Sequence, residues 1–172
     1  MTPTLTFTVP GVAETKGSTR AFIPKGWTRP IITNDNPKAK GWQRLIAEHA
    51  TQALASLKLQ PFADGPVLLD VWFYFPRPKK FLIKKYADVD VPHLSTPDAD
   101  KCLRLVIDAL TRVVYPDDSR VIDAYVHKRY CAAGELPRAV ITVRAVTVDL
   151  PKPVHHPHTP TLFGQEALYV ET

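Results

Sequence analysis

Residues 97–128 read PDADKCLRLVIDALTRVVYPDDSRVIDAYVHK, and they contain a helix, a turn and a strand in succession. Apolar side chains recur at helical spacing between Lys101 and Val113, which predicts an amphipathic helix. Pro116 and the two aspartates after it are typical of a turn, and the run 121–130 predicts a strand. The stretch therefore predicts an α/β fold in which aspartates precede and follow one helix in the sequence.

The segments before residue 60 add one strand, one irregular region and one helix. Apolar residues alternate with threonines over residues 5–9, which predicts an edge or hairpin strand. Two short apolar runs within residues 21–34 fit a hairpin or a mobile flap equally well. Residues 38–57 contain no proline and repeat apolar residues at helical spacing, so we expect a helix there.

Two further strands complete the predicted sheet. Residues 67–75 read VLLDVWFYF, which is rich in β-branched and aromatic residues and indicates a central strand. Residues 139–148 predict another strand, which we expect to pair with 121–130 as an antiparallel hairpin. The elements together predict a small mixed β-sheet of four to five strands flanked by two α-helices.

The length and composition indicate one globular domain followed by a tail. The chain has 172 residues, with 45% hydrophobic and 23% charged residues, which excludes a disordered or collagen-like protein. We expect residues 1–149 to form the domain, because residues 150–172 are rich in proline and histidine and cannot build a core. The formal charge of +5 predicts a surface that attracts a polyanion such as nucleic acid or an anionic membrane.

The two cysteines indicate a reduced, intracellular protein. Cys102 and Cys131 form no CxxC pair and have no histidine at zinc-ligand spacing, so a structural zinc site is not expected. The start MTPTLTFTV lacks the features of a signal peptide, and no apolar run approaches membrane-spanning length. We therefore expect a cytoplasmic protein with no membrane partner.

The aspartates around the predicted helix suggest a site for a hard divalent cation. We expect Asp98 to Asp100 to be extended, with Asp100 as the N-cap, so that both carboxylates face one ion. Asp117 or Asp118 is a candidate third ligand, and Mg²⁺ prefers such oxygen ligands. Taken singly, an N-cap aspartate and a turn aspartate are common structural choices. Clustered acids beside a basic loop, however, indicate compensation by a metal or by ion pairs.

The same stretch resembles the signature of the RusA family of Holliday junction resolvases. The likeness consists of P-D-x-D, a helix ending in D-A-L-T, the D-D-S turn and a strand ending in lysine. It extends more weakly upstream through TFTVPGVAETKGSTRAFIP and covers most of residues 4–147. The resemblance implies a homodimeric, magnesium-dependent endonuclease of phage or prophage type that nicks four-way DNA junctions symmetrically during recombination and repair in a bacterial cytoplasm.

The resemblance also implies roles for individual residues. Asp98, Asp100 and Asp118 match the metal-binding and catalytic aspartates of the family, with Mg²⁺ as the expected cofactor and Mn²⁺ as a substitute. This chain departs from the family at two positions: Arg104 replaces a catalytic lysine, and Lys101 replaces an asparagine. Arginine keeps the positive charge but cannot donate a proton near neutral pH, so Lys101 is the alternative proton donor.

A basic loop and several scattered cations are candidates for DNA contacts. The loop RPKKFLIKKY interleaves cations with apolar side chains, which suits phosphate contacts and a wedge at an unpaired base, although a solvated loop fits equally well. Phe81 and Tyr86 are the predicted wedge residues. Lys128 is at most a phosphate contact. The remaining candidates for the DNA track are Lys16, Arg20, Lys25, Arg77, Lys79, Lys80, Lys84 and Lys85.

Two other functions and the role of the tail stay open at this point. The chain fits a nuclease for other branched or flap DNA, or a DNA-junction-binding protein without turnover. The three intact aspartates favour an enzyme, whereas Arg104 favours the non-catalytic alternative. In the tail, His155, His156 and His158 are expected to be solvated, and residues 159–164 (TPTLFG) either pack on the domain or contact a sliding clamp.

Overall fold

A four-stranded mixed sheet forms the centre of the computed structural model, which describes residues 2–17, 19–34, 36–86 and 89–147. The strands are β1 (Thr4–Pro10), β4 (Val67–Phe75), β5 (Val121–Tyr130) and β6 (Arg138–Ala145), in the spatial order β1-β6-β4-β5. β6 pairs antiparallel with both β1 and β4, whereas β5 runs parallel to β4. The edge position of β1 and the central position of β4 confirm the predictions for both strands.

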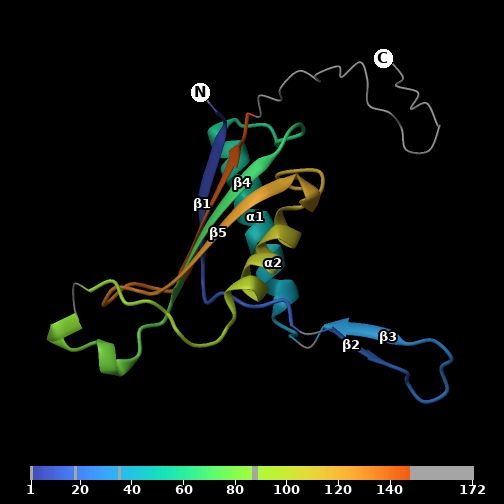
Figure 1. Cartoon of the computed structure of the whole chain (residues 1–172), viewed down its shortest axis with the longest axis horizontal. Helices are drawn as coiled ribbons and strands as arrows, with labels where there is room; N and C mark the ends of the chain where they lie inside the picture. The colour runs from blue at the N-terminus through green and yellow to red at the C-terminus, as the bar shows by residue number, and fades with distance from the viewer. Residues whose placement is uncertain (1, 18, 35, 87–88, 148–172) are drawn as a thin grey trace, which may run out of the picture.

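Two helices, α1 (Ala39–Leu57) and α2 (Ala99–Leu110), lie together against one face of the sheet (Figure 1). Residues of β4 alternate strictly between buried and half-buried, because only one of its faces meets the helices. The buried face packs Leu69, Val71 and Phe73 against Trp42 and Ile46 of α1 and the apolar side of α2 in a single core. The structure thus confirms a small α/β fold.

The structure corrects the predicted pairing of β5 with β6. The two strands lie on opposite sides of β4, so they do not form a hairpin. Both belong to one sheet because the apolar strand β4 accepts a partner along each edge, and residues 131–137 carry the chain from one side to the other. Sequence spacing alone favoured the hairpin, since adjacent strands often pair directly.

The ends of α2 also differ from the prediction. The helix begins at Ala99 and ends at Leu110, rather than covering 101–113. It ends there because Thr111 is extended and Arg112 has a φ of 65°, which closes a tight turn through a hydrogen bond from the Arg112 amide to the Tyr115 carbonyl.

Two segments stand outside this central body. β2 (Thr19–Phe22) and β3 (Ile31–Asn34) pair with each other and with no other described strand. They form a hairpin that projects from the domain (Figure 1), which is one of the two alternatives predicted for this region. The long connection after β4 carries the short 3-10 helices η1 (Lys79–Phe81) and η2 (Lys84–Tyr86). A third 3-10 helix, η3 (Asp118–Arg120), precedes β5. The predictions for the tail concern residues outside the described part of the chain.

None of the helices described is both long enough and apolar enough to cross a membrane.

Candidate active site

Asp98 and Asp100 lie at the start of α2, and the backbone of Asp98 is extended, as predicted, whereas that of Asp100 is helical. Asp98 is the N-cap and is extended, with φ −68° and ψ 140°, and its carbonyl accepts the first helical hydrogen bond from Cys102. Asp100 lies inside the first turn, so the prediction that Asp100 is the N-cap is wrong, and the extended segment expected to turn both carboxylates toward one ion is not formed. Ala99 adopts helical geometry easily, which lets the helix start directly after Asp98. Both carboxylates are exposed, and neither caps the helix with its side chain.

The Asp98 carboxylate is paired with a neighbouring cation. Lys101 Nζ lies 2.7 Å from Asp98 Oδ2, and both side chains are about half exposed. The hydrogen bond and the charge of Lys101 hold the pKa of Asp98 below its usual value, with a smaller contribution from Lys128. The same pair raises the pKa of Lys101. Asp98 is therefore ionised throughout the neutral range, as a ligand for a hard cation must be.

Lys128 holds the chain that leads into Asp98. Its Nζ atom donates hydrogen bonds to the carbonyl oxygens of Ser95 at 2.7 Å and Pro97 at 2.5 Å. The position is possible because the end of β5 lies beside the segment that precedes α2, where Pro92 and Arg129 form an antiparallel bridge. The Lys128 ammonium thus fixes the segment on which Asp98 depends, a role that sequence reasoning missed because the two segments lie far apart in the chain.

The segment before Ser95 is fixed from the same strand. The His93 amide donates to the Lys128 carbonyl at 3.1 Å, and the Tyr130 amide donates to the Val91 carbonyl at 2.9 Å. The His93 ring stacks on Phe75, with the ring centroids 4.1 Å apart. Burial lowers the pKa of His93, and the charge of Lys128 lowers it further, so His93 is neutral near pH 7. These contacts fix residues 91–97, the segment that leads to Asp98, against the domain.

A hollow of about 430 Å³ lies beside this group of residues. The segment 12–15 lines one side, and Thr96, Pro97, Asp98 and Lys101 line the other. Glu14, whose carboxylate accepts a hydrogen bond from Asn36 at 3.0 Å, brings a further acid to the same hollow. Nothing in the sequence pattern singled out Glu14, because it follows the first strand and no motif links it to Asp98.

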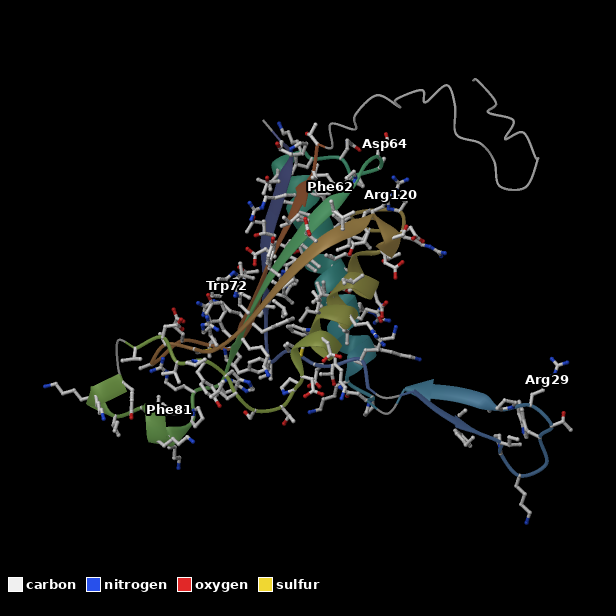
Figure 2. The ribbon with its side chains drawn as sticks, viewed as in Figure 1. Arg29, Phe62, Asp64, Trp72, Phe81 and Arg120 are labelled. Atoms are coloured by element: carbon white, nitrogen blue, oxygen red, sulfur yellow. The ribbon has the colours of Figure 1, made fainter. Side chains whose placement is uncertain are left out.

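Asp118 lies at the other end of α2. The helix has 12 residues, which corresponds to about 18 Å along its axis. Figure 2 shows Arg120, also in η3, at the same end of the molecule as Phe62 and Asp64, away from the first turn of α2. Asp117 caps η3 by accepting a hydrogen bond from the Ser119 amide. Hydrogen bonding to the Ser119 side chain, and then to its amide, lowers the pKa of Asp117. Asp118 is exposed beside it.

The three predicted metal ligands are therefore not brought together within one chain. Among the residues that the structure describes, no group of three or more histidine, cysteine, aspartate or glutamate side chains is placed to hold a metal ion. Asp98 and Asp100 form one acidic group, and Asp118 belongs to another.

The cations on α2 have distinct surroundings. Arg104 is exposed one turn after Asp100, and residues four apart lie on the same helix face. Arg104 thus projects next to the acidic group. Lys16, a predicted DNA contact, forms an ion pair with Asp108 further along the helix.

The basic loop is divided between a structural arginine and exposed lysines. Arg77 donates to the carbonyls of Tyr86 at 2.6 Å, Val89 at 2.9 Å and Cys131 at 2.6 Å, so its guanidinium is engaged within the protein. Phe81, labelled in Figure 2, packs edge-on against Tyr86 and also meets the ring of Tyr130.

The other predicted DNA contacts are exposed or fall outside the description. The side chain of Arg20 lies outside the described part. The predicted contacts that are exposed on the loop and the hairpin are Lys25, Lys79, Lys80, Lys84 and Lys85.

The fold and the site define a small basic α/β protein with exposed aspartates at a helix start and a lysine-rich loop. A family model described as Endodeoxyribonuclease RusA matches residues 14–144. The chain belongs to the RusA family of endodeoxyribonucleases, which confirms the family predicted from the sequence. Membership supports nuclease activity on DNA.

One curated relative comes from a bacterium. The chain is 32% identical over 146 residues to the uncharacterized protein YqaN of Bacillus subtilis (strain 168). The match covers 82% of this chain and 96% of the relative. The similarity therefore extends over nearly the whole of that protein.

Proposed function

We propose that this protein is a magnesium-dependent, homodimeric endonuclease that resolves four-way DNA junctions by paired symmetric nicks in a bacterial cytoplasm. The observation that supports it best is the pair of exposed carboxylates, Asp98 and Asp100, on a helix start that Lys128 holds in place. The family supplies the DNA substrate class, and the exposed lysines of residues 79–85 supply charges complementary to a polyanion.

The donor set at the start of α2 fits a hard divalent ion. Asp98 and Asp100 offer carboxylate oxygens, which Mg²⁺ and Mn²⁺ prefer, and Asp98 is already ionised. A bound Mg²⁺ would supply an activated water and charge stabilisation at the scissile phosphate. Lys101 contacts only the Oδ2 atom of Asp98, so the other carboxylate oxygen could face the ion while the Lys101 ammonium would be available to the leaving oxygen. Arg104, one turn along the helix, is placed to hold a phosphate oxygen by its fixed charge.

We further propose that Asp118 completes the site of a second copy of the chain. Within the described residues, the outer edge of β5 carries no partner strand over residues 121–127, and Ile122 and Tyr125 are each 53% exposed there. Such an edge favours pairing with another strand. In a dimer with two-fold symmetry, that strand would be β5 of the second copy.

Antiparallel pairing centred near Ala124 would oppose Val121 to His127 of the second copy. Asp118 of that copy would then approach the end of β5, where Lys128 contacts the segment before Asp98. Each site would take Asp98 and Asp100 from one chain and Asp118 from the other. Two such sites related by two-fold symmetry suit a junction that requires two cuts.

Cleavage of a synthetic four-way junction, with and without Mg²⁺, tests the proposal. We expect Asp100→Asn to abolish cleavage and to leave binding intact or stronger, because it removes a ligand and a charge that repels phosphate. Glu48→Gln, which removes an exposed carboxylate on α1, a helix that carries no proposed site residue, is the matched control and should cleave normally.

Each alternative gives a different result in the same assay. Normal turnover by Asp100→Asn would reject the site. Tight metal-independent binding without cleavage by the natural chain would instead identify a junction-binding protein, the alternative that Arg104 favours. Preferential cleavage of flaps would identify a nuclease for other branched DNA.

A further inference from the structure

The hairpin formed by β2 and β3, which we call the arm (residues 19–34), has an unusual composition. Its sequence, TRAFIPKGWTRPIITN, contains three cations and no acidic residue. Its two strands pair with each other and with no other described strand, and it projects from the domain with Arg29 near its tip (Figures 1 and 2). The arm is therefore a positively charged extension.

Large apolar side chains on the arm are exposed to solvent. Phe22 is 51% exposed, and Ile23 and Trp27 are each 61% exposed. The other two tryptophans are engaged: Trp42 is 5% exposed in the core, and Trp72 stacks on His127 with the ring centroids 3.9 Å apart. A projecting tryptophan between cations has no role in the packing of the domain, which points to a ligand that covers it.

The charges of the arm select the kind of ligand. Lys25 and Arg29 flank Trp27, and neither forms an ion pair with another residue that the structure describes. A hollow of about 290 Å³ at the tip is lined by Gly26, Trp27, Thr28 and Arg29. A second copy of this chain, with its net charge of +5, is a poor electrostatic match for such a surface. A polyanion with flat aromatic groups matches both features.

We propose that the arm binds DNA at a branch, with Trp27 stacked on an unpaired base and Lys25 and Arg29 on the adjoining phosphates. This inference rests on the proposed function only in taking branched DNA as the ligand. The arm rather than the basic loop provides the stacking residue, because Phe81 packs against Tyr86 and Tyr130. Stacking on tryptophan is tolerant of sequence, since every base has a π-face.

The test uses the full chain carrying Asp100→Asn and a chelator, so that cleavage does not interfere with binding. Trp27→Ala should weaken binding to a four-way junction and to a single strand by roughly tenfold, and binding to a linear duplex of equal length by less than twofold. Trp27→Phe should restore most of the affinity, because a smaller aromatic ring still stacks. Leu136→Ala, which removes an exposed apolar side chain elsewhere, should leave all three affinities unchanged.

Fluorescence gives an independent measurement of the same contact. A single strand should quench the tryptophan emission of the Asp100→Asn chain, and the quenching should disappear in the Trp27→Phe variant because Trp42 and Trp72 are not at the contact.

Three results bear on the proposal in different ways. Equal weakening of binding to junction and duplex would overturn base stacking. A change of oligomeric mass in light scattering, with unchanged DNA affinity, would show that the arm contacts a second copy instead. If the natural chain does not cleave DNA but the Trp27 variants still change DNA affinity as expected, the proposed nuclease is rejected and the arm remains a DNA contact.

Discussion

Lys128 is expected to position Asp98 rather than to contact DNA, because its ammonium donates hydrogen bonds to the carbonyl oxygens of Ser95 and Pro97. We expect Lys128→Gln to slow single-turnover cleavage by at least tenfold at saturating Mg²⁺. Junction affinity should keep its salt dependence. A residue that contacts one phosphate would instead lower the slope of log affinity against log salt by about 0.9.

Lys80→Gln is the matched control for this measurement, since Lys80 is exposed on the basic loop. It should lower the salt slope and leave the cleavage step nearly unchanged. A lower slope together with normal cleavage for Lys128→Gln would show that Lys128 contacts DNA and does not position Asp98.

Arg104 tests whether the site needs a fixed charge or a transferable proton. If it holds a phosphate oxygen, Arg104→Lys should retain most activity, and Arg104→Ala should lose roughly a hundredfold, as for other single electrostatic donors. If a proton is required, Lys101→Ala should be the more damaging change and should alter the alkaline side of the pH profile, because a general acid stops donating only above its own pKa. Full activity in both alanine variants would remove both residues from the mechanism.

At the residue scale, the sequence predicted which aspartates form the candidate site, but it did not predict the backbone geometry of Asp100. Asp98 and Asp100 could be predicted because P-D-x-D is part of the RusA signature, although single aspartates at a helix start are common structural choices. Which of the two is the N-cap depended on whether Ala99 entered the helix; alanine permits a helical backbone but does not by itself fix the residue at which the helix starts. The contacts of Lys128 and Glu14 depend on how distant segments fold together, and no local pattern reports that.

Among the elements, the loop with η1 and η2 has the clearest electrostatic test. Replacement of four lysines by alanine should flatten the salt dependence of junction binding; the four are Lys79, Lys80, Lys84 and Lys85. Each phosphate contact that is lost reduces the number of counterions released when DNA binds. Arg77 stays in place and should preserve the fold of the loop, which circular dichroism can check. An unchanged slope would mean that the loop is only a solvated surface.

The elements themselves were predicted more successfully than their pairing. α1, β1 and β4 follow from local periodicity, which reflects one buried face in each. The placement of β5 and β6 on opposite sides of β4 depends on the whole sheet. A strand with apolar residues over its full length accepts two neighbours, and sequence order does not say which two.

The whole molecule is tested by combining two inactive chains. If each site takes Asp98 and Asp100 from one copy and Asp118 from the other, a heterodimer of Asp100→Asn with Asp118→Asn chains has one intact site. Purified through two different tags, it should nick one strand of a junction, whereas either homodimer should be inactive. A site complete within one chain would leave the heterodimer inactive too, because each of its sites would carry one substitution.

The 12 residues of α2 also fix the distance between Asp98 and Asp118 within one chain. In a two-fold dimer, each chain would supply Asp98 and Asp100 to one site and Asp118 to the other. The length of α2 therefore sets the distance between the two sites, and with it the spacing of the two cuts along the DNA. One inserted residue would turn the end of the helix by about 100° and misdirect Asp118. Across related chains, insertions and deletions should therefore gather in the arm and in the basic loop, while the interval from Asp98 to Asp118 keeps a constant length.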